Sequence, residues 1–324
     1  RPRPPPGSSL SRRIGMSEKK IMMWMNGRLI EQEKALLPFM THALHYGSSV
    51  FEGIRIYDTP KGKAVFRLRE HMVRFLNSAK VMCMAHPYTI EELIEATKLA
   101  VRHASPDSDY VRPLMWYGEN DENRIVINPF KFKVNVAIAC AHMGAYLGKE
   151  NMEKGAKLIT SSWTKMANTS TSLQAKIGGN YVNSILAKIE ATQLGADECL
   201  MLNTNGTVAE GPGENIFMVK NGKLFTPPLA SGVLEGITKD SVVTIAQDKG
   251  YQVIEKEITR SEVYMCDEFF MTGTAAEITP VRSLDERIIG DGRRGPITKV
   301  LQEAFFEAAR GNDPRYVHWL TPVA

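Results

Sequence analysis

A chain of 324 residues, 43% hydrophobic and 23% charged, has the composition of an ordinary globular protein and is long enough for about two domains. Its formal net charge of +4 is too small to indicate nucleic acid or a membrane surface as a partner. No apolar run approaches the roughly 20 residues that a helix needs to span a bilayer, so we expect no membrane segment.

We expect residues 1–15 to form a leader that is disordered or was added by cloning. The run RPRPPPGSSLSRRIG is rich in proline and arginine and lacks the apolar core of a secretory signal. Its proline cluster also opposes the amphipathic helix that a transit peptide needs.

The cysteines Cys83, Cys140, Cys199 and Cys266 are too far apart in the sequence to form a CxxC pair. They are typical of reduced thiols in a cytoplasmic protein rather than of a disulfide framework or a zinc site. No set of histidines and acids stands at metal-binding spacing, so we expect no metal ion.

Residues 16–141 have the pattern of a small α+β domain. Asn26-Gly27 between two apolar runs predicts a β-hairpin, and Thr89, three residues before Glu92, predicts a capped helix start. Apolar residues at helical or alternating spacing predict the other elements of this part. They are a helix from about residue 71 and strands over 109–118 and 131–142.

Glycines and charges interrupt this pattern near residues 142–150, where we place the connection to a second domain over 151–324. A helix is predicted over 181–195, because four apolar residues share one of its faces: Val182, Ile185, Leu186 and Ile189. Short strands follow it, and Asn205-Gly206 and Asn221-Gly222 each favour a type I′ hairpin turn between two of them.

Four turns in the second half supply groups that complement one another chemically. They offer an amine (Lys176), a carboxylate (Glu210), amides at a helix start (Ile237, Thr238) and amides at a tight turn (Thr274, Ala275). A pyridoxal phosphate site needs a lysine for the aldehyde, an acid for the pyridine nitrogen and free amides for the phosphate and a carboxylate. Each residue alone has a more ordinary structural role, so the hypothesis depends on their combination.

At these residues the sequence resembles the fold-type IV pyridoxal phosphate enzymes, and within them the bacterial-type branched-chain amino acid aminotransferases. The resemblance implies an α+β fold with a small N-terminal domain, a larger C-terminal domain around a barrel-like β core, and a site at the domain interface. It extends from about Met22 to Trp319 through HALHYGSSVFEGIR (42–55), FRLREHMVRF (66–75), YVRPL (110–114), SSW (161–163), AKIGGNY (175–181), EGPGENIF (210–217), LEGITKD (234–240) and GTAAEITPVRS (273–283).

The resemblance implies that Lys176 forms the internal aldimine with pyridoxal 5′-phosphate and later moves a proton between substrate and cofactor. Glu210 is implied to pair with the pyridine nitrogen, Tyr181 to bond the phenolic oxygen and Leu234 to pack on the ring. The phosphate is implied to contact Arg74, Ile237, Thr238 and Thr274.

The implied substrate pocket must hold an apolar side chain in one half-reaction and a second carboxylate in the other. Aromatic rings fit the first, and a guanidinium with a tyrosine hydroxyl fits the second. The backbone of Thr274 and Ala275 is implied to hold the α-carboxylate that both substrates share. The other implied members of the pocket are Tyr46, Phe51, Gly53, Arg55, Tyr110 and Arg112.

The implied reaction is the reversible, ping-pong transfer of the amino group of L-leucine, L-isoleucine or L-valine to 2-oxoglutarate. Such enzymes form homodimers, or trimers of dimers (hexamers), whose pockets are completed across the interface. Ile127 is a candidate for reaching a neighbour's pocket. Met143 stands where bacterial relatives often carry a tryptophan, which leaves the preferred side chain open, aromatic substrates included.

Two alternatives remain open. A sister enzyme such as a D-amino acid transaminase, an R-selective amine transaminase or aminodeoxychorismate lyase would share the cofactor residues, although YGSSVFEGIR and YVRPL weigh against it. A non-catalytic or nucleotide-binding protein is suggested by GDGRRG at 290–295, a literal G-x-G-x-x-G before a predicted helix. That run lies too near the C-terminus for a following strand and a ribose-binding acid, which favours a simple turn.

Overall fold

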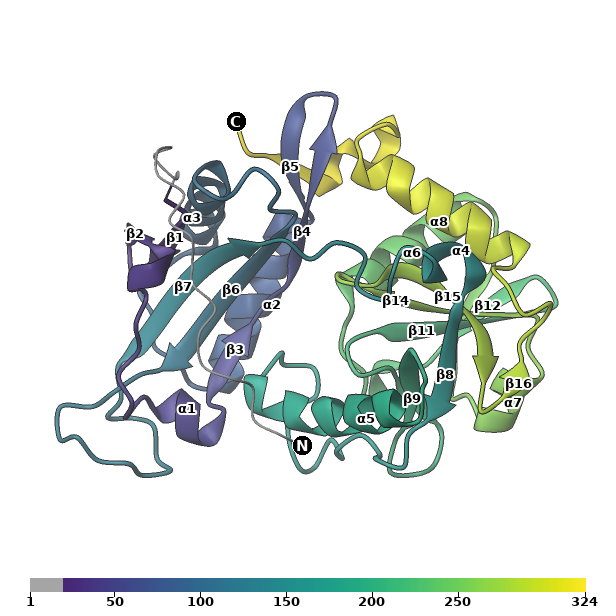
Figure 1. Cartoon of the computed structure of the whole chain (residues 1–324), viewed down its shortest axis with the longest axis horizontal. Coiled ribbons are helices and arrows are strands. Elements are labelled where there is room, and N and C mark those ends of the chain that lie inside the picture. Colours follow the sequence, from purple (N-terminus) through teal and green to yellow (C-terminus); the bar gives the residue numbers. More distant parts are fainter. Residues whose placement is uncertain (1–19) are drawn as a thin grey trace, which may run out of the picture.

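The first half of the chain builds an antiparallel sheet with two long helices packed against it (Figure 1). The computed structural model describes residues 20–324, and the expected leader over 1–15 lies outside them. The strands of this first sheet are β1 (Met22–Met25), β2 (Arg28–Glu31), β3 (Ser49–Phe51), β4 (Ile54–Thr59), β5 (Gly62–Phe66), β6 (Tyr110–Tyr117), β7 (Val134–Ala141) and, from the C-terminal end of the chain, β17 (Leu320–Pro322). Its helices are α1 (His42–Tyr46), α2 (Leu68–Val81) and α3 (Ile90–Arg102).

The second half builds a mixed, curled sheet that stands beside the first one (Figure 1). Its strands are β8 (Ala156–Thr160), β9 (Glu198–Leu202), β10 (Val208–Glu210), β11 (Asn215–Lys220), β12 (Lys223–Thr226), β13 (Val253–Glu255), β14 (Glu268–Gly273), β15 (Glu277–Leu284) and β16 (Arg287–Ile288). Its helices are α4 (Asn151–Lys154), α5 (Tyr181–Gln193), α6 (Ile237–Asp248), α7 (Arg260–Tyr264) and α8 (Pro296–Ala309).

The order of the strands confirms the expected α+β class. Among residues 20–324 the first sheet runs β17-β5-β4-β6-β7-β1-β2, with β3 beside β6. The second runs β10-β9-β8-β15-β14-β11-β12-β13, with β16 beside β15. Helices α2 and α3 share an apolar core with the first sheet, and α6 and α8 share another with the second. No helix within residues 20–324 has both the length and the apolar character to cross a membrane.

Local sequence signals account for several element ends. Asn26 and Gly27 have φ values of 47° and 91°, so the predicted hairpin between β1 and β2 is confirmed. Thr89 accepts from the Glu92 N–H while the Glu92 carboxylate accepts from Thr89, which confirms the capping box of α3. Helix α2 begins at Leu68, slightly before the predicted start near residue 71.

The predicted type I′ turn at Asn205-Gly206 is wrong. Gly206 has a φ of 85°, but Asn205 does not adopt the positive φ that such a turn requires at both central residues. The Asn203 side chain instead accepts hydrogen bonds from the N–H groups of Asn205 and Thr207 and supports a wider turn. The other predicted type I′ turn, at Asn221-Gly222, is confirmed by φ values of 51° and 73°.

Helix α5 turns its apolar stripe away from the sheet. The predicted helix is confirmed, but Val182, Ile185 and Ile189 are 59%, 54% and 47% exposed. Its buried residues are small: Ser184, Ala187 and Ala191. These small side chains let α5 pack closely on β9, and the larger apolar residues form a surface that residues 20–324 leave exposed.

Two segments join the halves. Residues 142–150 run from β7 to α4 and cross between the two sheets (Figure 1). At the other end of the chain, β17 returns and pairs with β5 of the first sheet. The C-terminal strand therefore belongs to the first sheet, although its residues lie in the range 151–324 that the sequence pattern assigns to the second domain.

Candidate active site

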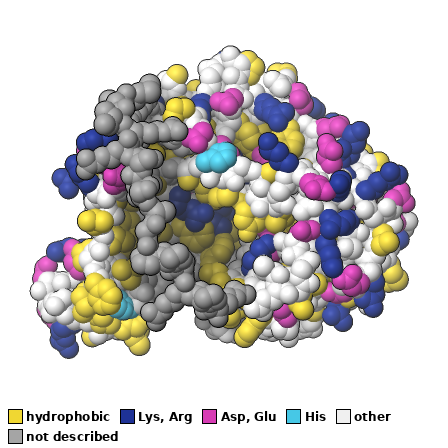
Figure 2. All heavy atoms as spheres, in the orientation of Figure 1, with side chains coloured by type: hydrophobic (Ala, Val, Ile, Leu, Met, Phe, Trp, Pro, Cys, Tyr) yellow, Lys and Arg dark blue, Asp and Glu magenta, His cyan; other side chains and the backbone are white. Residues whose placement is uncertain are grey.

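A cavity of about 170 Å³ lies between the two halves of the molecule. Figure 2 shows basic side chains gathered in the hollow between them, bordered by hydrophobic ones. An adjoining recess holds Glu210. Most residues expected at the site line the cavity: Phe51, Gly53, Arg74, Tyr110, Arg112, Met143, Lys176, Tyr181, Leu234, Ile237, Thr238, Thr274 and Ala275.

Lys176 reaches the cavity from a segment whose backbone is fixed on both sides. Its N–H donates to Ser78 Oγ at 2.9 Å, and its carbonyl accepts from the Phe51 N–H at 3.1 Å. The side-chain Nζ donates to Tyr181 Oη at 2.6 Å. Burial and the nearby Arg74 guanidinium lower the pKa of Lys176 to about 8. The amine can therefore lose its proton near neutral pH, as a lysine nucleophile must.

The first turn of α6 presents its backbone N–H groups to the cavity. Ile237 and Thr238 line the cavity in this turn, and no side chain of the described residues caps the helix start. Arg74 on α2 approaches the same place, and its Nη1 donates to the Glu235 carbonyl at 2.6 Å. A helix start beside a guanidinium is a favourable site for a phosphate or another anion.

A buried carboxylate fixes Arg74. Glu52 accepts from Arg74 Nε at 2.6 Å and Nη2 at 2.8 Å, and from His71 Nδ1 at 2.7 Å. Burial opposes the ionisation of Glu52, but Arg74 and His71 hold the pKa of this carboxyl well below its usual range. The three side chains form one network that keeps the guanidinium in place at the cavity wall.

The helix start of α8, which follows GDGRRG, is already occupied. The Glu268 carboxylate accepts from the N–H groups of Ile297 and Thr298 and from the Thr298 hydroxyl, at 2.6–2.9 Å. A Cβ on Gly295 would collide with the same carboxylate. These contacts consume the donors that a bound nucleotide phosphate would need, so the glycine run serves the packing of Glu268.

Glu210 ends β10 and is held by three donors. Its Oε2 accepts from Asn215 Nδ2 at 3.1 Å and from the Leu234 N–H at 3.0 Å. Its Oε1 lies 2.8 Å from Lys165 Nζ, and both side chains are buried. Each carboxylate oxygen can accept about two hydrogen bonds, so Oε1 keeps one free lone pair for a donor in the recess.

The first half contributes aromatic and basic groups to the opposite wall. The Arg112 guanidinium lies 4.8 Å from the centre of the Phe51 ring, and its Nη2 donates to Tyr110 Oη at 3.3 Å. The Tyr110 hydroxyl fits against Gly53, where a Cβ would lie 1.8 Å from Tyr110 Oη. A glycine at this position is therefore required for the tyrosine to reach the cavity.

Besides Glu210, which lies in the adjoining recess, two expected site residues and one expected interface residue do not line this cavity. Arg55 lies behind the turn after β14, where it donates to the carbonyls of Thr274 and Ala275. Tyr46 ends α1 and is 43% exposed, and Ile127 is 80% exposed on the loop between β6 and β7. None of the three touches the cavity of its own chain.

Several further residues join the site without having been predicted. Tyr146 lies on the same connecting loop as Met143, a position that the loop could have suggested. Lys165 carries no local signal, because its partner Glu210 is distant in sequence. Burial and the neighbouring Glu198 raise the pKa of Glu214, which favours its neutral form. The other unpredicted lining residues are Gly213, Asn215, Gly236, Thr272 and Gly273.

The sequence matches a known family over most of its length. The family described as Amino-transferase class IV matches residues 49–284. The chain is 44% identical over 310 residues to the branched-chain-amino-acid aminotransferase of Pseudomonas aeruginosa, and this match covers 96% of this chain and 100% of that protein.

Solved structures give the same result. The Escherichia coli branched-chain amino acid aminotransferase has a TM-score of 0.91 at 44% identity, with 94% of this chain and 100% of that chain covered. The branched-chain amino acid aminotransferase of the archaeon Thermoproteus uzoniensis with norvaline has a TM-score of 0.88 at 42% identity, with 94% and 100% covered. A third branched-chain amino acid aminotransferase, complexed with N-(5′-phosphopyridoxyl)-L-glutamate, has a TM-score of 0.88 at 49% identity, with 94% and 99% covered. The similarity therefore includes both halves of the molecule.

Proposed function

The chain belongs to the class IV aminotransferase family, and from this premise we propose the reaction that its cavity performs. It transfers the amino group of L-leucine, L-isoleucine or L-valine to 2-oxoglutarate, reversibly and in two half-reactions, with pyridoxal 5′-phosphate as cofactor. The observation that carries the proposal is the Lys176 amine, which faces the cavity with a pKa lowered to about 8.

The residues present fit the cofactor. The uncapped start of α6 and Arg74 suit its phosphate, and the free lone pair of Glu210 Oε1 suits a protonated pyridine nitrogen. The Thr272 hydroxyl at the cavity wall is buried without a hydrogen-bond partner among residues 20–324, as expected where a bound molecule completes the contacts. Tyr181 and Leu234 also line the cavity, where they can contact the ring of the cofactor.

When bound, pyridoxal phosphate supplies the electron sink that makes the α-hydrogen of an amino acid acidic. Lys176 Nζ is the base that accepts this proton and returns it, and the Tyr181 hydroxyl at 2.6 Å orients the amine. Glu210 holds the pyridine proton. Burial and Glu210 raise the pKa of Tyr181, so its hydroxyl keeps its proton as a hydrogen-bond donor.

The pocket can accept either an apolar side chain or a second carboxylate, because the Arg112 guanidinium stacks on the Phe51 ring. Phe51, Met143 and Tyr146 provide an apolar lining for a branched side chain. Arg112, stacked on Phe51 and exposed at the cavity mouth, binds the second carboxylate of glutamate or 2-oxoglutarate. The N–H groups of Thr274 and Ala275 bind the α-carboxylate that all these substrates share.

We further propose that the protein works as a homodimer or a trimer of dimers in the cytoplasm, with residues 16–141 and 151–324 as its two domains joined by 142–150. The exposed apolar stripe of α5 is a surface that a second copy would cover. In such an assembly Tyr46 and Ile127, which do not touch the cavity of their own chain, would complete the cavity of a neighbour. Four free cysteines agree with a reducing compartment.

The absorption spectrum of the purified holoenzyme tests the proposal. We expect a visible band from the lysine-bound cofactor, which L-leucine and L-glutamate each convert to the near-ultraviolet band of the aminated cofactor. Lys176→Ala, reconstituted with the cofactor, serves as the control and should lack both the visible lysine-dependent band and turnover.

Two outcomes would contradict the proposal. Conversion by D-alanine or by R-amines, with no response to L-leucine, would identify a sister enzyme of the same family. The absence of any visible band after addition of pyridoxal phosphate would remove the role of Lys176 altogether.

A further inference from the structure

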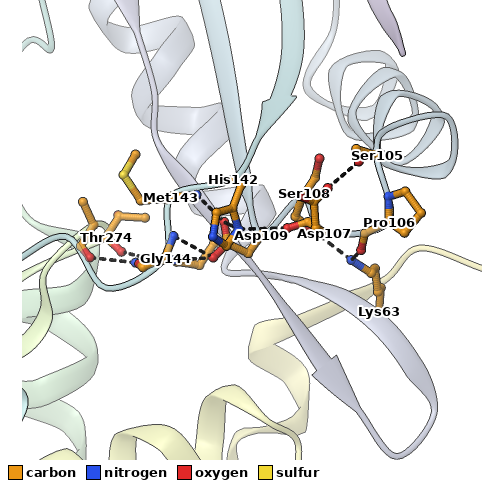
Figure 3. A network of polar contacts seen from close by, with 12 residues as sticks. Lys63, Ser105, Pro106, Asp107, Ser108, Asp109, His142, Met143, Gly144 and Thr274 are labelled. Atoms are coloured by element: carbon orange, nitrogen blue, oxygen red, sulfur yellow. Dashed lines mark hydrogen bonds and ion pairs between the residues drawn. The ribbon is translucent and has the colours of Figure 1, made fainter. Parts of the chain in front are cut away.

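A single carboxylate joins the loop between the two domains to the first sheet. Asp109 immediately precedes β6, and its Oδ1 accepts from the Met143 N–H at 2.6 Å. Its Oδ2 accepts from the Gly144 N–H at 3.0 Å (Figure 3). The same oxygen accepts from Arg55 Nη1, also at 3.0 Å. These contacts hold the start of the connecting loop, which then continues to Tyr146 at the cavity wall.

Arg55 extends the contact to the other side of the cavity. Its Nη2 donates to the carbonyls of Gly144 at 2.6 Å and Ala275 at 2.8 Å, and its Nε donates to the Thr274 carbonyl at 3.1 Å. The side chain is only 6% exposed, and Asp109 is the anion that pairs with it. One guanidinium thus connects the interdomain loop to the turn after β14.

One contact of Arg55 determines where the Ala275 N–H group points. In a trans peptide unit the C=O of one residue and the N–H of the next point in opposite directions. Arg55 holds the Thr274 carbonyl behind the turn, so the Ala275 N–H points the other way. Thr274 and Ala275 line the cavity, and within residues 20–324 the Ala275 N–H donates to no other backbone group.

We propose that Asp109 is a positioning residue that aligns the substrate-binding turn through Arg55 and holds the loop that carries Met143. This inference rests on the proposed function, because it is the α-carboxylate of the substrate that the aligned N–H group would bind. Without the carboxylate the buried Arg55 guanidinium loses its only ion-pair partner among the described residues, and the Met143 and Gly144 N–H groups lose their acceptor.

The neighbouring Asp107 offers a matched control. Its carboxylate accepts from the Ser105 hydroxyl and contacts neither Arg55 nor the loop N–H groups. Its backbone carbonyl accepts from His142 Nδ1, a contact that a side-chain substitution leaves in place. Lys63 anchors the same segment through the carbonyls of Pro106 and Ser108 (Figure 3).

Amide hydrogen exchange of the full chain, with and without added cofactor, provides the first test. In Asp109→Asn we expect exchange at Met143 and Gly144 to accelerate about tenfold, since two charge-assisted hydrogen bonds weaken. Asp107→Asn should exchange like the wild type at these positions. Unchanged exchange in both Asp109→Asn and Asp109→Ala would overturn the proposal, whatever reaction the protein catalyses.

Steady-state kinetics provides the second test. Asp109→Asn should raise the KM for L-leucine and for 2-oxoglutarate by about tenfold each, with kcat changed less than about threefold, because both substrates share the α-carboxylate. Thermal unfolding of each variant identifies a loss of fold, and Asp109→Ala repeats the comparison. A rise for only one substrate, or an equal rise in Asp107→Asn, would overturn the proposal. A wild-type protein without aminotransfer activity would contradict the proposed function, while the exchange test of the Asp109 contacts still stands.

Discussion

Lys165 Nζ lies 2.8 Å from Glu210 Oε1, and the two side chains form a buried ion pair beneath the cavity. Burial opposes the charge on Lys165, but the Glu210 carboxylate outweighs it and raises the pKa of the lysine. The lysine therefore stays charged, and Oε1 is shared between it and the group that we expect to bind in the recess. The carboxylate cannot rotate, because Asn215 and Leu234 hold its other oxygen.

Removal of the lysine should destabilise the protein more than a surface pair would. In Lys165→Met the buried Glu210 carboxylate loses its cation, and we expect the free energy of unfolding to fall by about 3 kcal/mol. Urea denaturation of the cofactor-free chain measures this change. Lys133→Met is the comparison, because its partner Asp121 is exposed and stays hydrated without the lysine, and an equal loss in both variants would contradict a special role of Lys165.

The Glu52–Arg74 pair predicts a change in cofactor affinity. Glu52→Gln keeps the shape of the side chain but removes the charge that holds Arg74 at two nitrogens. We expect the Kd for pyridoxal phosphate to rise at least about tenfold, which corresponds to about 1.4 kcal/mol. The measurement is a titration of the cofactor-free chain followed by absorbance.

The control for this titration is Glu70→Gln on the same helix. Glu70 pairs with Arg67, and its side chain is 41% exposed, so its loss should leave the Kd unchanged. Equal cofactor affinity in wild type and Glu52→Gln would show that Arg74 does not depend on Glu52.

How much of the fold and of the site can be predicted from the sequence depends on whether the residues that determine each feature are close together in the chain. The turn at Asn221-Gly222 and the capping box at Thr89 are local, because one or two residues determine the backbone conformation there. These two features were predictable because each is encoded within a few neighbouring positions. Most of the expected site residues also come together at one cavity, but this expectation came from the family resemblance and not from a local signal.

The features that could not be predicted are long-range pairings. Lys165 meets Glu210 and Asp109 meets Met143 only because the fold brings distant segments together. Neither lysine nor aspartate differs in sequence from a solvated surface residue. The outward turn of Ile185 on α5 has the same cause, since periodicity identifies an apolar face but not what covers it.

The lowered pKa of Lys176 predicts how stability changes with pH. The pKa is about 8 in the folded chain against 10.5 for an ordinary lysine, so above pH 8 the unfolded chain binds more protons than the folded one. Below about pH 8 the buried, charged amine of Lys176 destabilises the folded chain by its full amount, and this destabilisation disappears as the pH rises to 10.5. Relative to Lys176→Met, the wild type should therefore gain at most about 3 kcal/mol between these pH values.

Chemical denaturation of both cofactor-free proteins at about pH 7.5 and about pH 10, on either side of most of this titration, measures the difference. Other groups titrate in the same range, but they are common to the two proteins and cancel in the comparison. A constant difference between wild type and Lys176→Met across this range would mean that the amine has an ordinary pKa and is not activated by burial.

The uncovered stripe of α5 predicts where the chain associates with a second copy. Ile185 is 54% exposed between Val182 and Ile189, and a charge at this position would have to be buried if another chain covers the stripe. We expect Ile185→Glu to dissociate the proposed dimer, as measured by light scattering after gel filtration. Activity should also fall if, as proposed, Tyr46 and Ile127 complete a neighbour's cavity. Ile288→Glu is the matched control, since Ile288 is 68% exposed on β16, away from α5, and its substitution should leave the mass unchanged. An Ile185→Glu protein with the mass of the wild-type assembly would place the interface elsewhere.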